Sequence, residues 1–356
     1  MPKMTTLSTD GQGTRPLDRR RSTMRDVAAL AGVSLKTVSR VINAEPAVSA
    51  DLLARVERAI EQLDYRPNLT ASSLRRSDGK TATVGLVLED LANPYSAAVT
   101  RAVEDAARPR RVTVVAGSVD EDPDRERALV REFVARRVDG LIVAPTAADQ
   151  SYLIADRRAG IALVFVDRPP RNLDADAVVA ANRSGAADGV RHLLGRGHLR
   201  IGFLGDMATI STAAERYAGY VDAVERAGLP IDESIVRRDL RSVDAARTAV
   251  EELLRLPLPP TAIFAAQNVL GICAFAALRG LQRQFDVALV GFDDFPLADL
   301  LDPGVTVVAQ DPGAIGRLAA ETLFRRLDGD RSPSTVQVVP TRLIVRGSGE
   351  IVPPVG

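Results

Sequence analysis

Residues 24–40 read MRDVAALAGVSLKTVSR, and this stretch decides the first part of the fold. Thr23 can cap a helix that ends at Gly32, because threonine is favoured at helix starts and glycine just past helix ends. The apolar face of this helix is formed by Val27, Ala28, Leu30 and Ala31. The pattern therefore predicts a short helix followed at once by a tight turn.

Two more helices are predicted after this turn. Ser34 can cap the first of them, which runs to about Asn43 and buries Val38 together with Val41 or Ile42. Its outward-facing residues are Leu35, Lys36, Ser39 and Arg40. The next helix, about residues 50–63, carries its apolar residues in helical register at Leu53, Val56, Ile60 and Leu63. Together the three helices predict a small all-α domain over residues 22–66.

The spacing within this domain is typical of a helix-turn-helix, in which the second helix lies in the major groove of DNA. Ala28 is small where the two helices cross, and Gly32 relieves the turn. Lys36 and Arg40 lie on the outer side of the second helix, where they can meet base edges and phosphates. The combination favours a DNA-binding headpiece over a generic three-helix bundle.

Charge is distributed unevenly along the chain. Residues 1–80 contain 14 Lys and Arg against 9 Asp and Glu, whereas the remainder contains 32 against 37. This asymmetry suits a basic module for a polyanion on a near-neutral or acidic body, although an ordinary solvated surface fits it as well. Residues 1–21 lack apolar periodicity, end in Arg19, Arg20 and Arg21, and are predicted to be a disordered basic tail.

Beyond residue 80 the chain alternates apolar runs with amphipathic helical stretches. The predicted strands are Val84–Leu88, Val112–Ala116, Gly140–Val143, Ala162–Val166, Ala177–Val179, Ile201–Leu204, Ala262–Ala265 and Val287–Val290. Helices are predicted between most of them, as at Ala97–Ala107, Asp124–Arg136 and Arg183–Gly195. Such alternation predicts parallel sheets covered on both faces, with ligands beyond the carboxyl ends of the strands.

The composition excludes several classes of site. The single cysteine, Cys273, and the two histidines, His192 and His198, leave too few ligands for a disulfide framework or a zinc site, so we expect no metal or other cofactor. We interpret Cys273 as a core residue and both histidines as structural. No apolar run approaches the length of a membrane span and no signal peptide is visible, so we expect a cytoplasmic protein.

Residues 23–43 resemble the headpiece of the lac repressor (LacI/GalR) family. The segments YRPN at 65–68 and LTASSLR at 69–75 resemble the linker and hinge helix of that family, in which a leucine wedges into the minor groove; Leu74 occupies that position. Residues 67–80 are accordingly predicted as hinge helix and linker. The resemblance implies DNA contacts at Ser34, Leu35, Lys36, Thr37, Ser39, Arg40, Asn43, Asn68, Ala71 and Leu74.

The rest of the chain, to about residue 347, resembles the effector-binding core of the same family. The resemblance is carried by NPY (93–95), VDR (166–168), GHLRIG (197–202), ERYAGY (215–220), VGFDD (290–294) and PLADLLDP (296–303). It implies a periplasmic-binding-protein-like α/β core, residues 81–356, of two doubly wound parallel-sheet lobes. The predicted lobes are residues 81–180 with 311–330, and residues 181–310 with 331–350.

The resemblance also implies an effector cleft between the lobes. Its expected lining residues are Tyr95, Ser96, Asp167, Arg216, Gln267 and Asp293. Carboxylates that accept hydrogen bonds and a guanidinium that donates them suit a polyhydroxylated ligand. We therefore expect a sugar or sugar derivative as the effector, with a nucleoside or purine as the second choice. Ser96 replaces a common aromatic residue, Gln267-Asn268 replaces a usual Asn-Asp pair, and Gln284 replaces a frequent proline. These departures prevent the transfer of any one relative's ligand.

The function predicted from the sequence is that of a homodimeric transcription repressor that binds a near-palindromic operator and is controlled by a small effector. An activator or a co-repressor-dependent regulator of the same family remains an alternative. A sugar-binding enzyme is a remote one, because neither a phosphate-binding loop nor a dinucleotide fingerprint is present. A transport binding protein would lack the headpiece. A dimer is expected rather than a tetramer, because no leucine heptad follows the core.

Overall fold

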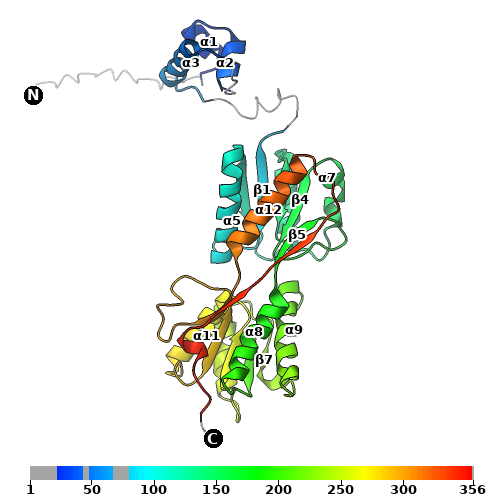
Figure 1. The fold of residues 1–356 in the computed structure, drawn as a ribbon, viewed down its shortest axis with the longest axis vertical. Coiled ribbons are helices and arrows are strands. Elements are labelled where there is room, and N and C mark those ends of the chain that lie inside the picture. The colour runs from blue at the N-terminus through cyan, green and yellow to red at the C-terminus, as the bar shows by residue number, and fades with distance from the viewer. Residues whose placement is uncertain (1–21, 43–47, 67–79, 355–356) are drawn as a thin grey trace, which may run out of the picture. The chain divides into compact units, whose positions relative to one another are not determined.

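The computed structural model describes residues 22–42, 48–66 and 80–354 (Figure 1). Its contacts divide the chain into two compact units, residues 1–79 and 80–356. The first unit contains the headpiece and the second contains the core. The division falls at the end of the segment expected to be the linker.

The headpiece consists of three helices, α1 (Met24–Ala31), α2 (Leu35–Ile42) and α3 (Ala50–Gln62). Thr23 caps α1 with its hydroxyl, which accepts from the amide of Asp26, while the Asp26 carboxylate accepts from the amide of Thr23 at 2.7 Å. Gly32 ends α1 in the left-handed region, at φ 63°. The start and the end of α1 are therefore where the two capping residues predict them.

The core of the headpiece forms where the three helices meet. Its buried residues are Val27, Ala28, Ala31, Val38, Val41, Val56, Ala59 and Tyr65. Two of the expected core residues are wrong: Leu30 is 50% exposed and Leu53 is 39% exposed. Each lies at the edge of a narrow buried face, because successive residues of a helix are rotated by about 100° and these short helices bury only the middle of the apolar stripe.

The first lobe of the core is built on a six-stranded sheet in the order β11-β5-β4-β3-β1-β2, with every pair parallel. Its strands are β1 (Thr83–Leu88), β2 (Thr113–Ser118), β3 (Gly140–Val143), β4 (Ala162–Val166), β5 (Asp176–Ala180) and β11 (Val336–Val339). Helices α5 (Pro94–Ala107) and α12 (Pro312–Leu327) cover one face, and α6 (Pro123–Ala135) covers the other. The short helix α7 (Ile154–Arg158) precedes β4.

The second lobe repeats this plan in the order β12-β10-β9-β8-β6-β7, with only the β10–β12 pair antiparallel among the described strands. Its strands are β6 (Ile201–Leu204), β7 (Val236–Arg237), β8 (Ala262–Ala265), β9 (Ala288–Phe292), β10 (Thr306–Ala309) and β12 (Arg342–Ile344). Helices α8 (Asn182–Gly195) and α9 (Ser211–Arg226) cover one face, and α10 (Val243–Leu254) and α11 (Asn268–Gly280) cover the other.

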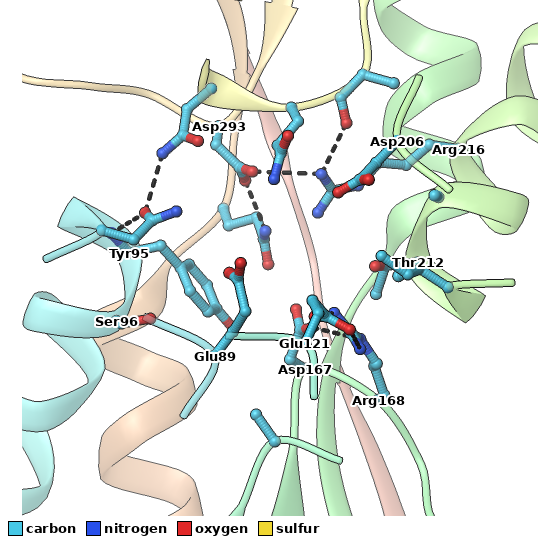
Figure 2. A pocket seen from close by; sticks show the side chains of 18 of the residues that line it. Glu89, Tyr95, Ser96, Glu121, Asp167, Arg168, Asp206, Thr212, Arg216 and Asp293 are labelled. Atoms are coloured by element: carbon cyan, nitrogen blue, oxygen red, sulfur yellow. Dashed lines mark hydrogen bonds and ion pairs between the residues drawn. The ribbon is translucent and has the colours of Figure 1, made fainter. Parts of the chain in front are cut away.

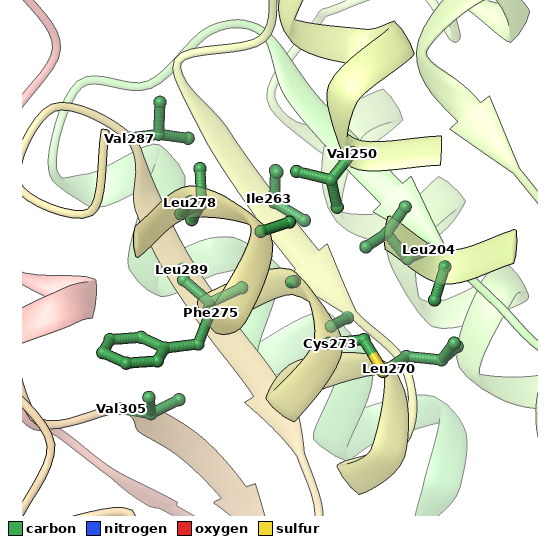
Figure 3. Packing of buried hydrophobic residues seen from close by; sticks show 14 of the residues in the cluster. Leu204, Val250, Ile263, Leu270, Cys273, Phe275, Leu278, Val287, Leu289 and Val305 are labelled. Carbon is green, nitrogen blue, oxygen red and sulfur yellow. The ribbon is translucent and has the colours of Figure 1, made fainter. Parts of the chain in front are cut away.

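Both faces of the second sheet are buried, which explains its nearly continuous apolar strands. Figure 3 shows one of these faces, where Ile263 and Leu289 of the sheet pack against Val250 of α10 and Leu278 of α11. Cys273 lies within this cluster at 5% exposure. Burial raises the pKa of its thiol, which therefore stays protonated and uncharged. Cys273 is thus a core residue, as the sequence predicts.

The chain passes between the lobes three times: after β5, after β10 and after β11 (Figure 1). The expected lobe boundary is wrong at the last crossing. The sequence predicts that residues 331–350 lie in the second lobe, whereas Val336–Val339 pairs with Asp176–Ala180 in the sheet of the first lobe. Of the two strands within residues 331–350, only β12 belongs to the second sheet. A short strand next to a crossover fits either sheet by its own pattern, so only pairing decides where it lies.

Candidate functional site

The exposed surface of α2 carries the residues expected to read DNA. The Ser34 hydroxyl accepts from the amide of Thr37 at 3.1 Å and lies 3.0 Å from the Thr37 hydroxyl, so this pair holds the start of the helix. Leu35 is 44% exposed and Lys36 is also exposed. Ser39 and Arg40 are half-buried farther along the same helix. The first turn of α2 is therefore the most accessible part.

The turn before α2 is fastened to α3. The Arg55 guanidinium donates to the carbonyl oxygen of Ala31 at 2.7 Å and to that of Gly32 at 3.3 Å. These bonds satisfy carbonyl groups that the end of α1 leaves without helical partners. The orientation of α2 is thus supported by a basic residue on the third helix. Four further expected DNA contacts, Asn43, Asn68, Ala71 and Leu74, lie outside the described residues.

A pocket lies in the core between the two lobes, at the carboxyl ends of the strands of both sheets (Figure 2). It encloses about 660 Å³ of space not filled by protein atoms, part of which is open to solvent. The pocket is lined by all six residues expected in the effector cleft: Tyr95, Ser96, Asp167, Arg216, Gln267 and Asp293.

Arg216 is the most firmly held of these residues. It projects from α9 with 5% exposure, and its guanidinium donates to Asn182 Oδ1 at 2.8 Å and to the carbonyl oxygen of Ala266 at 2.8 Å. Its Nη1 lies 3.3 Å from Asp293 Oδ2, and its Cζ lies 3.9 Å from the centroid of the Phe292 ring. Four contacts therefore fix the plane of the guanidinium before any ligand arrives.

Asp293 follows β9 and is oriented from two sides. Besides its contact with Arg216, its Oδ1 accepts from Gln310 Nε2 at 2.6 Å. Gln310 lies where the chain passes from β10 into the first lobe. The carboxylate is 8% exposed in a left-handed backbone position, φ 71°. A buried, oriented carboxylate of this kind can accept hydrogen bonds from hydroxyl groups of a ligand.

The other side of the pocket is formed by the first lobe. Arg168 makes two bonds to Glu121, one of them from Nη1 to Oε2 at 2.9 Å, and its Nε lies 3.2 Å from Asp167 Oδ2. Nη1 also donates to the carbonyl oxygen of Pro145 at 3.1 Å. The neighbouring carboxylates raise the pKa of Arg168 against the effect of its burial. The guanidinium is thus a fixed charge shared by two acidic residues.

Glu89 lies directly after β1, close to this group. Figure 2 shows its carboxyl group directed into the pocket, between the ring of Tyr95 and the group of Glu121, Asp167 and Arg168. Burial raises the pKa of Glu89, the charges of Glu121, Asp167 and Asp206 act in the same direction and that of Arg168 opposes them, and together these effects bring the pKa to about 7. The Glu89 carboxyl group therefore gains or loses its proton near neutral pH.

Tyr95 lies at the start of α5, where Asn93 caps the helix by accepting from the Tyr95 amide at 3.0 Å. The Tyr95 hydroxyl is buried and has no hydrogen-bond partner among the described residues. Burial and the charges of Asp167 and Asp293 raise the pKa of Tyr95 well above its ordinary value, so the hydroxyl stays protonated. Ser96 is buried beside it, and Gln267 precedes α11 at the opposite wall.

Several lining residues were not expected from the sequence: Glu89, Glu121, Arg168, Asp206, Asn268 and Gln310. Most of them follow a strand by one to three residues. The signal that could have found them is position alone, since parallel strands bring their carboxyl ends to the same edge of a sheet. Within the described residues, no group of three or more His, Cys, Asp or Glu side chains is placed to hold a metal ion.

The two histidines have structural partners in the second lobe. His198 is fully buried and lies 2.9 Å from both the Thr261 hydroxyl and the carbonyl oxygen of Ile351. Its burial lowers its pKa. His192 Nε2 lies 3.0 Å from the carbonyl oxygen of Gly349. Both therefore hold the C-terminal segment, which agrees with the structural roles expected of them.

Comparison with known proteins finds matches for both the headpiece and the core. Residues 23–68 match the family described as bacterial regulatory proteins, lacI family, and residues 190–349 match the periplasmic binding protein-like domain. The transcriptional regulator PtxS of Pseudomonas aeruginosa is 36% identical over 340 residues, 93% of this chain and 96% of that protein.

Two solved structures extend the comparison to the fold. The lac repressor dimer bound to operator and an anti-inducer is similar with a TM-score of 0.81 at 26% identity, covering 93% of this chain and 99% of that one. The complex of the regulator CelR with cellobiose is similar with a TM-score of 0.68 at 32% identity, covering 92% and 100%. No helix in the described part of the chain is long and apolar enough to cross a membrane.

Proposed function

The chain belongs to the lac repressor family of DNA-binding transcription regulators, and on that premise we propose that it is a repressor released from its operator by a sugar-type effector. The observation that carries this proposal is the placement of Arg216 and Asp293. A buried arginine fixed by four contacts faces a pocket beside an oriented carboxylate, while the same chain carries a helix-turn-helix.

DNA recognition is assigned to the exposed first turn of α2. Lys36 can reach a phosphate or a guanine edge, and Leu35 can only pack against an apolar group such as a thymine methyl. Two headpieces of a homodimer would read the two halves of a near-palindromic operator. The lac repressor structure, a dimer on operator DNA, supports this arrangement. Because its target is DNA, we place the protein in the bacterial cytoplasm.

Control is assigned to the cleft between the lobes. A ligand that bridges Arg216 and Asp293 of the second lobe to Tyr95 and Asp167 of the first favours one orientation of the lobes. A ligand shifts an equilibrium only as far as its affinities for the two states differ. The orientation of the lobes sets the spacing of the hinge segments, and that spacing sets operator affinity. The cellobiose complex of CelR supports a sugar as the class of ligand.

The test is an electrophoretic shift of the purified protein on DNA from its own upstream region, repeated with a panel of sugars and nucleosides. A specific shift that one compound releases is the expected result. A shift that appears only with a compound would replace induction by co-repression. No specific shift on any DNA, including a genome-wide selection, would overturn the assignment as a regulator.

A further inference from the structure

The charges that line the pocket are unbalanced. Five carboxylates face two guanidinium groups: Glu89, Glu121, Asp167, Asp206 and Asp293 against Arg168 and Arg216. Both arginines are already engaged by protein acceptors, Arg168 by Glu121 and Asp167 and Arg216 by Asp293, Asn182 and a backbone carbonyl. An anionic ligand would therefore meet an excess of like charge.

Several polar groups of the pocket also lack hydrogen-bond partners. Among the described residues, no group donates to the carboxyl of Glu89 although it is directed into the pocket. Gln310 uses its amide nitrogen on Asp293, which leaves its Oε1 buried without a partner. The buried hydroxyl of Tyr95 is also without a partner. Buried polar groups are rarely left unpaired, so the Gln310 oxygen indicates a ligand group that donates a hydrogen bond, and the Tyr95 hydroxyl, which can donate or accept, indicates a polar ligand group beside it.

The carboxylates approach the pocket from several elements. Glu89 follows β1, Glu121 follows β2, Asp167 and Arg168 follow β4, and Asp206 follows β6. A metal ion does not explain this arrangement, because the described residues contain no group placed to hold one. An organic cation fits better, since it needs carboxylates around a hydrogen-bonded ammonium rather than close coordination.

We propose that the cleft takes a polyhydroxylated ligand that carries a protonated amine, with the ammonium beside Glu89 and the hydroxyl groups at Asp293, Gln310 and Tyr95. This inference rests on the proposed function and narrows its effector to the amino-sugar class. The ammonium supplies the donors that Glu89 lacks and reduces the excess of negative charge. A sugar acid or a sugar phosphate would increase that excess.

The proton on Glu89 adds a property that depends on pH. An ammonium favours the ionised carboxylate, and Glu89 holds a proton part of the time near neutrality because burial and the charges of Glu121, Asp167 and Asp206 raise its pKa more than Arg168 lowers it. Binding of the amine therefore displaces this proton. Its affinity should rise between about pH 5.5 and about pH 7, a range in which amines stay largely protonated. A neutral sugar should show no comparable rise.

The experiment is isothermal titration calorimetry of the full chain with matched sugars of the glucose, galactose and mannose series. Each series compares the neutral hexose with its 2-amino and 6-amino derivatives and its uronate at about pH 6.5. We expect one amino sugar to bind at least about tenfold more tightly than its parent hexose. No uronate should bind as tightly as its parent. A uronate that binds best, equal binding of amino and neutral sugars, or no binding of any amino sugar would overturn the inference.

Two variants locate the effect. Glu89→Gln keeps the shape of the side chain and should abolish both the preference for the amino sugar over its parent hexose and the dependence of that preference on pH. Glu132→Gln changes an exposed glutamate of α6 and should leave both preferences unchanged. A preference that survives in Glu89→Gln would overturn the placement of the ammonium.

The same protein preparation separates this inference from the proposed function. Operator binding is measured by electrophoretic shift in parallel with the calorimetry. Specific DNA binding that a neutral or acidic sugar releases would reject the amino-sugar class and leave the repressor assignment intact. Absence of specific DNA binding, with amino-sugar binding retained, would reject the repressor assignment and leave the chemistry of the cleft intact.

Discussion

Asn268 of the second lobe donates from its side-chain nitrogen to Asn93 Oδ1 of the first lobe at 3.0 Å. The same Asn93 oxygen caps α5, and Asn268 Oδ1 accepts from the amide of Val269 at the start of α11. The bond therefore links the starts of two helices on opposite sides of the cleft. Its formation depends on the orientation of the lobes, so it contributes to the equilibrium that the effector is proposed to shift.

Asn268→Asp should weaken lobe closure in the absence of ligand. The substitution keeps an acceptor for the Val269 amide but replaces the donor that faces Asn93 by a carboxylate oxygen. One net hydrogen bond is worth about 1 kcal/mol, so amide exchange over residues 91–97 should rise by about fivefold in hydrogen–deuterium exchange. Asn268→Gln serves as a control that retains the donor. Unchanged exchange in Asn268→Asp would mean that this bond does not limit opening.

Arg216→Ala should abolish the effector response without loss of operator binding. Loss of the guanidinium leaves Asp293 buried beside an unfilled space, and removal of one partner of a buried ion pair costs about 3 to 5 kcal/mol of the free energy of unfolding. Calorimetry on Arg216→Lys, which retains a charge but not the paired donors to Asn182 and Ala266, checks the effect in a more stable chain. Wild-type ligand affinity in both variants would remove Arg216 from the site.

Glu89→Gln should stabilise the ligand-free core at high pH. The pKa of Glu89 is about 7 in the fold and about 4.3 in an unfolded chain. The folded state thus binds this proton more tightly, and its contribution to stability is present below about pH 4 and is lost as pH rises to about 7. The variant does not lose this contribution, so its free energy of unfolding should gain about 1 to 3 kcal/mol relative to wild type as pH rises from about 4 to about 7.

Urea unfolding of the two proteins at a series of pH values measures this difference. Glu132→Gln, an exposed glutamate of α6, is the matched control and should show no gain that depends on pH. A constant difference between Glu89→Gln and wild type across the whole range would mean that the pKa of Glu89 is not raised in the folded chain.

Leu74→Ala should weaken operator binding and leave effector binding intact. The resemblance of residues 69–75 to the hinge helix of the family places Leu74 in the minor groove, although the residue lies outside the described part of the chain. Loss of its buried apolar surface is worth about 1.5 to 3 kcal/mol, or about ten- to hundredfold in affinity. Quantitative electrophoretic shifts give the operator affinity, and calorimetry gives that of the ligand. Wild-type operator affinity in this variant would end the assignment of the wedge.

Local signals in the sequence determined much of this protein. Helix α1 begins after Thr23 and ends before Gly32, as predicted, because capping depends on residues within one turn of a helix end. All eight predicted strands are present with small shifts of their ends, since buried parallel strands read as apolar runs between helices. The six residues expected in the cleft from the family resemblance line one pocket.

Tertiary structure alone decided the rest. Val336–Val339 joins the first sheet because it pairs with β5, which no local pattern specifies. Leu30 and Leu53 are exposed because contacts between helices, rather than apolar character, determine which part of a stripe is covered. Glu89, Glu121 and Asp206 stand far apart in the sequence, and they share a pocket because parallel strands deliver their carboxyl ends to one edge. The excess of negative charge in the cleft, from which the ligand class is proposed, arises only when folding brings these carboxylates together.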